Sequence, residues 1–160
     1  ISAQLGDRGE KRINIIWETS YGEAARTLKK ENGEVVMHND SFVVPEEYQG
    51  QGIGAKVFGQ QIDTARKLGV KKIRTMASRS DRGGWIGYKV WPKFGYEGDI
   101  PPDIEVNPPN GERKVSELMR TKSGRDWWAE NGTSVGLEFD LTPGSYSMVT
   151  WEAYKRLKGI

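Results

Sequence analysis

The side chains best suited by type to acid–base chemistry lie near residue 40. His38 and Asp40, in the segment MHNDSFVV, are two positions apart and therefore share one face of an extended strand. An imidazole has an ordinary pKa of about 6.5, which suits removal of a proton at neutral pH. Either side chain could act as a general base; the alternative interpretation is a turn aspartate beside a surface histidine.

A glycine-rich segment follows, PEEYQGQGIGA from Pro45 to Ala55, with glycines at positions 50, 52 and 54. It lies between an apolar stretch and a pattern of helical period. The backbone N–H groups of such a turn can approach a ligand closely, and the N-terminus of the following helix adds a partial positive charge. The segment predicts an anion site suited to a pyrophosphate, with an ordinary tight turn as the alternative.

Three glycine patterns compete for this segment. A Walker loop requires lysine and then serine or threonine after its last glycine, and Gly54 is followed by Ala55. A dinucleotide fingerprint requires G-x-G-x-x-G and an acidic residue about 20 positions further on, and both are missing here. The third pattern, Gln/Arg-x-x-Gly-x-Gly/Ala, is matched by Gln49, Gly52 and Gly54.

That third pattern resembles the acyl-CoA-binding loop of the GNAT superfamily of N-acetyltransferases. Phe94-Gly95-Tyr96 is similar to a second element of that family. The resemblance implies acetyl-CoA as co-substrate, no metal, and a strand before the loop that hydrogen-bonds the pantetheine arm. It assigns the following residues to cofactor binding: Val44, Gln49, Gly50, Gln51, Gly52, Ile53, Gly54 and Ala55.

The resemblance also implies roles in catalysis. The family often places its base on the strand before the loop, where His38 and Asp40 lie, and it suggests the backbone N–H of Val44 as oxyanion donor. The family's usual acid is a tyrosine four residues before the glycine of the second element, but that position holds Trp91. Either Tyr88 supplies the proton, or the thiolate leaves without help, or the site is impaired.

Hydrophobic periodicity and turn signals predict the elements that must position these residues. Strands are expected at residues 11–18, 34–44, 70–77, 96–100 and 135–141. Helices are expected at 23–31, 52–68, 84–93, 115–131 with a break at Gly124, and 145–158, and a loop at 101–113. The strand–helix–strand run from residue 42 to 77 predicts an α/β fold. With the resemblance, this implies a GNAT-like mixed central sheet flanked by helices, with a helical insertion (about residues 101–131) between the last two strands.

Composition excludes several classes of protein. The 160 residues contain no cysteine and a single histidine, which excludes disulfides, thiolate nucleophiles and cysteine-ligated or multi-histidine metal sites. The net charge of +2 gives no argument for nucleic acid or a membrane surface. We expect one domain over residues 1–160, and the start at Ile1 suggests part of a longer protein.

The function expected from these observations is transfer of an acetyl group from acetyl-CoA to a primary amine, by direct attack in a ternary complex. The acceptor is a small molecule, a protein or an aminoacyl-tRNA, and no membrane partner is expected. Use of acetyl-CoA suggests a cytoplasmic location. The rival hypothesis is a catalytically impaired GNAT-like binding or structural module within a larger protein, motivated by Trp91.

Overall fold

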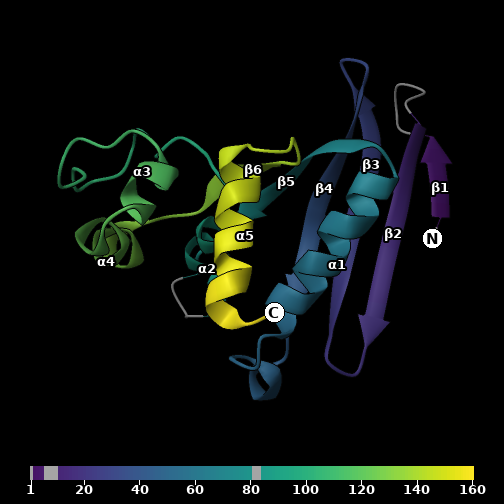
Figure 1. The fold of residues 1–160 in the computed structure, drawn as a ribbon, viewed down its shortest axis with the longest axis horizontal. Helices are drawn as coiled ribbons and strands as arrows, with labels where there is room; N and C mark the ends of the chain where they lie inside the picture. Colours follow the sequence, from purple (N-terminus) through teal and green to yellow (C-terminus); the bar gives the residue numbers. More distant parts are fainter. Residues whose placement is uncertain (1, 6–10, 81–83) are drawn as a thin grey trace. The chain divides into compact units, whose positions relative to one another are not determined.

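A computed structural model describes residues 2–5, 11–80 and 84–160 (Figure 1). Contacts divide the chain into two compact units, Ile1–Arg74 and Thr75–Ile160, and each is described by itself. The boundary falls within one strand, β5 (Val70–Ala77), so that this strand contributes to both units.

The first unit is a sheet with a helix. Its strands follow one another in the order β1-β2-β3-β4-β5, and the first four form antiparallel pairs. The connection from β4 to β5 runs through a helix, as in a βαβ unit, and the sheet is mixed, as expected. The bounds are β1 Ser2–Leu5, β2 Lys11–Thr19, β3 Gly22–Glu31, β4 Glu34–Val43 and α1 Ile53–Lys67.

The segment expected to be a helix at residues 23–31 is strand β3, so that prediction is wrong. Its alanines, lysines and glutamates favour a helix locally, but Ala24 and Leu28 are buried on one face of a strand that pairs along its length with β2 and β4. The turn to β4 is Asn32-Gly33, with φ of 48° and 87°. Two successive positive φ values are typical of a tight hairpin turn, which aligns Glu31 with Glu34.

Strand β4 is continuous through Asn39-Asp40, where the sequence left a hairpin or one long strand open. The pairing register changes at that point: Arg26 of β3 pairs with Asn39, and Ala25 pairs with Ser41. Asp40 is therefore an extra residue without a partner on β3, which defines a β-bulge.

Helix α1 packs on one face of this sheet. Its buried side chains recur at helical spacing. The register places the buried side chains of β3 and β4 that they pack against on a common face of the sheet. Gly69, with φ 71°, follows the helix as expected of a residue after a C-cap. The buried residues of this core include Ala24, Leu28, Met37, Ala55, Phe58, Ile62 and Ala65.

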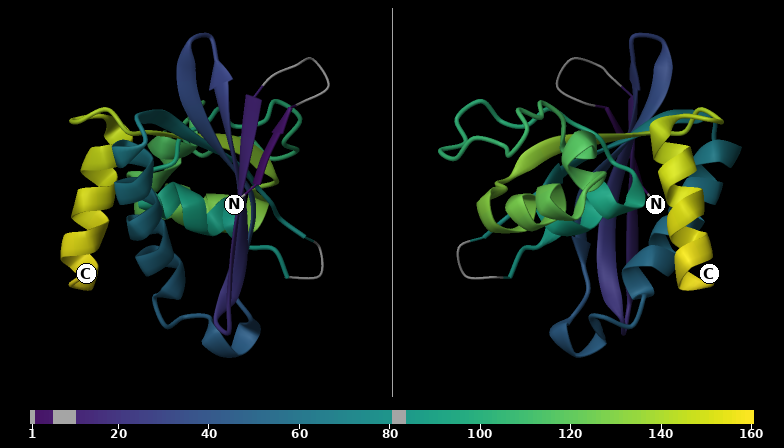
Figure 2. Two further views of the ribbon diagram at one scale, coloured as in Figure 1. Left: turned by 90° about the vertical axis from the view of Figure 1, so that its right-hand side faces the viewer. Right: turned by 60° about the vertical axis from the view of Figure 1, so that its left-hand side comes forward.

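The second unit combines the end of β5 and its sheet neighbour β6 with four helices, seen from two further sides in Figure 2. Residues 96–100 form no strand; Glu97 and Asp99 make isolated bridges to Glu138 and Lys114 instead. The elements are α2 Gly87–Phe94, α3 Val115–Met119, α4 Lys122–Asn131, β6 Val135–Asp140 and α5 Tyr146–Lys158.

The expected helical segment between the last two strands is present as α3 and α4, which pack on each other. The break lies at residues 120–121, not at Gly124. Thr121 caps α4 by accepting a hydrogen bond from the Gly124 N–H at 3.0 Å. Gly124 belongs to the first turn, where a Cβ would lie 2.3 Å from the Leu118 carbonyl oxygen, so close helix packing explains this glycine.

Phe94-Gly95-Tyr96 organises the aromatic core of the second unit. Gly95 ends α2 with φ 106°, and a Cβ there would lie 2.5 Å from the carbonyl oxygen of Ser147 in α5. Phe94 packs edge-on against Trp151, and Tyr96 against Phe139. The element therefore holds α2 close to α5, which is a packing role.

Candidate active site

The glycine turn leaves β4 and enters α1. After Pro45, a single 3-10 turn spans Glu46–Tyr48, and Gln49 returns to an extended backbone. Gly50 and Gly52 have φ of 76° and 77°, the left-handed region that side chains rarely adopt, and a Cβ at either position would meet no atom within 4 Å. These glycines are needed for the path of the backbone and leave open space beside it.

Gly52 is also the N-cap residue of α1, and no side chain caps this end of the helix. The first backbone hydrogen bond of the helix runs from Lys56 N–H to the Gly52 carbonyl. The N–H groups of residues 53–55 therefore have no acceptor within the helix, and the positive end of the helix dipole lies among them. The unpaired N–H groups and the positive end of the dipole together make this end of α1 suited to an anion.

Two glutamines of the loop bind the loop itself. The Gln49 side chain donates to the Val44 carbonyl at 3.0 Å, and the Gln51 side chain donates to the Glu47 carbonyl at 2.9 Å. Both side chains thus stabilise the turn. Of the residues expected to bind the cofactor, these two act through their side chains on the loop, and the backbone N–H of Gln49 is also engaged, donating to the Glu46 carbonyl at 3.1 Å.

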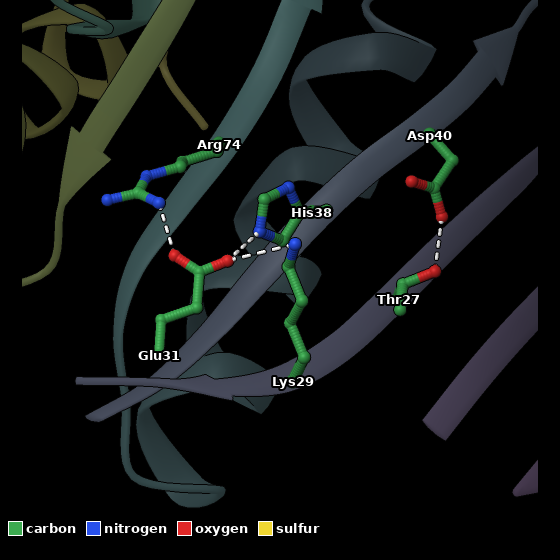
Figure 3. Close-up of polar contacts among 6 residues, drawn as sticks. All are labelled: Thr27, Lys29, Glu31, His38, Asp40 and Arg74. Atoms are coloured by element: carbon green, nitrogen blue, oxygen red, sulfur yellow. Dashed lines mark hydrogen bonds and ion pairs between the residues drawn. The ribbon is translucent and has the colours of Figure 1, made fainter. Parts of the chain in front are cut away.

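A polar network covers the sheet face opposite α1, shown close up in Figure 3. Asn39 points to α1, where it pairs with Gln61, so its neighbour His38 points to the other face. There His38 Nε2 lies 2.8 Å from Oε1 of Glu31 on β3. His38 is one quarter exposed, which leaves the ring open to a substrate.

Glu31 is surrounded by positive groups. Its Oε1 also lies 3.0 Å from Lys29 Nζ, and its Oε2 pairs with the Arg74 guanidinium from β5. Burial alone would raise the pKa of Glu31, but hydrogen bonds from Lys29 and His38 and the charge of Arg74 outweigh it. The pKa of Glu31 therefore lies below its ordinary value, and the group is a carboxylate at neutral pH.

Asp40, at the bulge, has different partners. Its Oδ2 accepts a hydrogen bond from the Thr27 hydroxyl at 2.6 Å, and the same hydroxyl lies 3.2 Å from Asn14 Oδ1 on β2. Thr27, Lys29 and Glu31 alternate along β3, so Asp40 and His38 share this face, as expected. Asp40 is exposed. Its carboxylate contacts the neutral hydroxyl of Thr27, whereas the imidazole of His38 contacts the charged carboxylate of Glu31.

The structure separates two of the expected catalytic groups. At a rise of about 3.3 Å per residue, the six positions from His38 to Val44 span about 20 Å of extended chain. In a regular strand, a base at His38 and an oxyanion donor at the Val44 N–H would therefore lie far apart, although here the bulge at Asp40 interrupts that spacing. The bulge at Asp40 lies nearer to His38.

Tyr88, the candidate acid, belongs to the second unit. Its hydroxyl donates to the Ala129 carbonyl at 3.0 Å, its own carbonyl accepts from the Trp128 indole at 2.8 Å, and its ring is almost fully buried. Trp91, in the usual tyrosine position, is packed against Tyr96. Trp85 precedes α2 and is half exposed.

The sequence profile of the acetyltransferase (GNAT) family matches residues 12–95, slightly more than half of the chain. The chain belongs to the GNAT acetyltransferase family. The match spans β2 to α2 and includes the glycine turn and the polar network of His38 and Glu31. Membership supports acyl transfer in general.

A solved structure is also similar to this GNAT chain. It is the crystal structure of a candidate acetyltransferase from Agrobacterium tumefaciens, with 17% identity and a TM-score of 0.45, over 84% of this chain and 80% of the other. No curated protein matches the sequence. The assignment to the family therefore stands on the sequence profile and on the described elements.

The described part of the chain has neither a metal cluster nor a membrane-spanning helix. Residues 2–5, 11–80 and 84–160 contain no group of three or more histidine, cysteine, aspartate or glutamate side chains that could hold a metal ion. Within the same ranges, no helix has the length and apolar character needed to cross a membrane.

Glu31 is the residue that sequence reasoning missed in this GNAT chain. The local pattern places it at the end of a helix, but it lies on strand β3 and forms an ion pair with Arg74 of β5. The dipeptide Asn32-Gly33 is a strong hairpin signal. Taken as a two-residue turn, it would have made Glu31 a strand residue and placed Thr27 opposite His38.

Proposed function

We propose that this GNAT protein transfers an acetyl group from acetyl-CoA to a primary amine, and that the glycine turn binds the pyrophosphate of the co-substrate. The observation that carries the proposal is the uncapped N-terminus of α1, preceded by two glycines with positive φ and open space beside them. The N–H groups there suit the negative charge of a pyrophosphate.

The length of β4 supports the same arrangement. From the turn, the strand leads back past the bulge to His38, and an extended pantetheine arm laid along it would bring the thioester toward that residue. The extra residue at Asp40 has no partner on β3, so its peptide group lies outside the β3–β4 register, and it is the peptide that we assign to the ligand. We prefer this peptide to Val44 as oxyanion donor because it lies nearer to the proposed base.

The chemistry then needs one base. The amine nitrogen attacks the thioester carbon, His38 accepts the amine proton, the carbon–sulfur bond breaks, and CoA leaves as a thiolate that later takes a proton from solvent or an acid. General-base catalysis of this kind contributes about 10²- to 10⁴-fold. No covalent nucleophile is needed, in keeping with a chain that has no cysteine.

Calorimetric titration of the purified protein with acetyl-CoA, and with CoA beside it, tests the proposal. Micromolar binding, about −8 kcal/mol, is expected. A screen of amine acceptors for release of free CoA thiol then tests transfer. Absence of binding at millimolar acetyl-CoA would overturn the proposal.

The rival function is a GNAT-like module that binds without turnover. Trp91, packed where the family usually has a tyrosine, and the engaged hydroxyl of Tyr88 favour it. Binding of acetyl-CoA without release of thiol to any class of amine would support the module over the enzyme.

A further inference from the structure

The contact between His38 and Glu31 indicates which ring nitrogen of His38 carries the hydrogen. Three nitrogen-bearing side chains converge on the Glu31 carboxylate: His38 Nε2 and Lys29 Nζ contact one oxygen, and the Arg74 guanidinium contacts the other. All three come from different strands of the first unit, β4, β3 and β5. A carboxylate held in this way has little freedom to turn.

An ionised carboxylate can only accept hydrogen bonds. Lys29 and Arg74 keep Glu31 ionised, so the hydrogen in the 2.8 Å contact must belong to the imidazole. In the neutral ring one nitrogen carries the hydrogen and the other has a lone pair. With Nε2 as donor, the lone pair is on Nδ1.

We propose that Glu31 is a positioning residue that fixes the tautomer of His38, so that Nδ1 is the atom that accepts the proton of the acceptor amine. The catalytic step rests on the proposed function, whereas the tautomer does not. The proton moves from the amine nitrogen to Nδ1, and the hydrogen on Nε2 stays in its bond to Glu31. The imidazolium formed in this way is stabilised by the charge-assisted hydrogen bond to the carboxylate.

Because the chain has a single histidine, its ring can be observed without assignment. The full chain labelled with ¹⁵N-histidine is examined by long-range ¹H–¹⁵N NMR at a pH where the ring is neutral. The expected spectrum shows Nε2 with the shift of a protonated ring nitrogen and Nδ1 with that of an unprotonated one. A ring with its hydrogen on Nδ1 would overturn the proposal without any variant.

Glu31→Gln tests the cause. An amide can either accept from Nε2 or donate to it, so the neutral ring should become a mixture of both tautomers. Glu34→Gln is the matched control: it makes the same change in an exposed residue directly opposite Glu31 in the β3–β4 register. It should leave the spectrum unchanged. Unchanged tautomers in Glu31→Gln would overturn the proposal.

Kinetics test the consequence. In Glu31→Gln, kcat should fall by about tenfold or more, but by less than in His38→Gln, with the dissociation constant of acetyl-CoA unchanged. Far-UV circular dichroism and acetyl-CoA binding show whether the variant is folded. If the tautomer changes while kcat stays at the wild-type value, the positioning role is overturned. A wild-type chain with the expected tautomer but no turnover would support the tautomer and overturn the proposed function.

Discussion

Asn39 on β4 and Gln61 on α1 form a buried pair of amide side chains, in which the Gln61 amide donates to the Asn39 carbonyl oxygen. Gln61 also lies 3.0 Å from the sulfur of Met37. Buried polar groups are costly unless they are paired, so this contact fixes how α1 lies along β4. This polar contact adds a specific position to the apolar packing of the helix whose N-terminus forms the glycine turn.

Removing one amide of this pair should destabilise the chain. We expect Gln61→Leu to lower the free energy of unfolding by about 1–3 kcal/mol, because the buried Asn39 side chain loses its hydrogen bond from Gln61. The double change to Leu at both positions should cost less than the sum of the two single changes. Urea denaturation of the four proteins measures the coupling; strict additivity would contradict the pairing.

The glycine turn can be tested by filling the space beside it. Gly52→Trp should weaken acetyl-CoA binding at least about 100-fold, or about 2.7 kcal/mol, because the indole would occupy the space beside the α1 N-terminus. Gly69→Trp is the matched control at the other end of the same helix. Gly69 has a similar positive φ of 71° and similarly open surroundings. Both variants therefore carry the same backbone strain, but only Gly52→Trp fills the space proposed for the ligand. Equal affinities in the two variants would contradict the loop assignment.

The two candidate bases can be separated by substitutions of similar size. His38→Gln should lower kcat by about 10²- to 10⁴-fold with acetyl-CoA binding unchanged. Asp40→Asn keeps the size of the side chain and its ability to accept the hydrogen bond from Thr27. We expect this variant to lower kcat by less than about tenfold. The reverse order of effects, measured by CoA thiol release, would move the base to Asp40.

Tyr88→Phe distinguishes an acid from a packed residue. The hydroxyl hydrogen is donated to Ala129, so an acid role requires that hydrogen bond to break. We expect the variant to lose about 1 kcal/mol of stability while turnover changes by less than about threefold. If turnover instead fell by about two orders of magnitude with stability retained, the acid would be assigned to Tyr88.

The lowered pKa of Glu31 predicts a pH dependence of stability. Its ionised form is stabilised in the folded chain, so its contribution is complete above the ordinary value of 4.5 and is lost as the pH falls through the folded-state pKa. The difference in unfolding midpoint between wild type and Glu31→Gln should be largest at about pH 6 and shrink below about pH 4. A difference for Glu31→Gln that stays constant with pH would contradict the lowered pKa.

The parts of the fold that depend on neighbouring residues in sequence were predictable. The turn at Gly52, the helix after it and the cap at Ser145 are specified within a few residues, and the structure has them. The structure of residues 23–31 was not predictable in this way, because their helix propensity is outweighed by pairing with strands on both sides. Glu31 was missed for the same reason: its contact with His38 exists only once β3 is a strand.

Asp40 shows that the β3–β4 ladder contains one residue more than pairing requires. Asn39 and Phe42 face α1 on either side of it, so deleting Asp40 would leave every other side chain on its present face and give an uninterrupted ladder. A chain one residue shorter should therefore fold at least as readily. Under the proposed function the extra residue serves the ligand, so the shorter strand should gain a regular ladder and lose acetyl transfer.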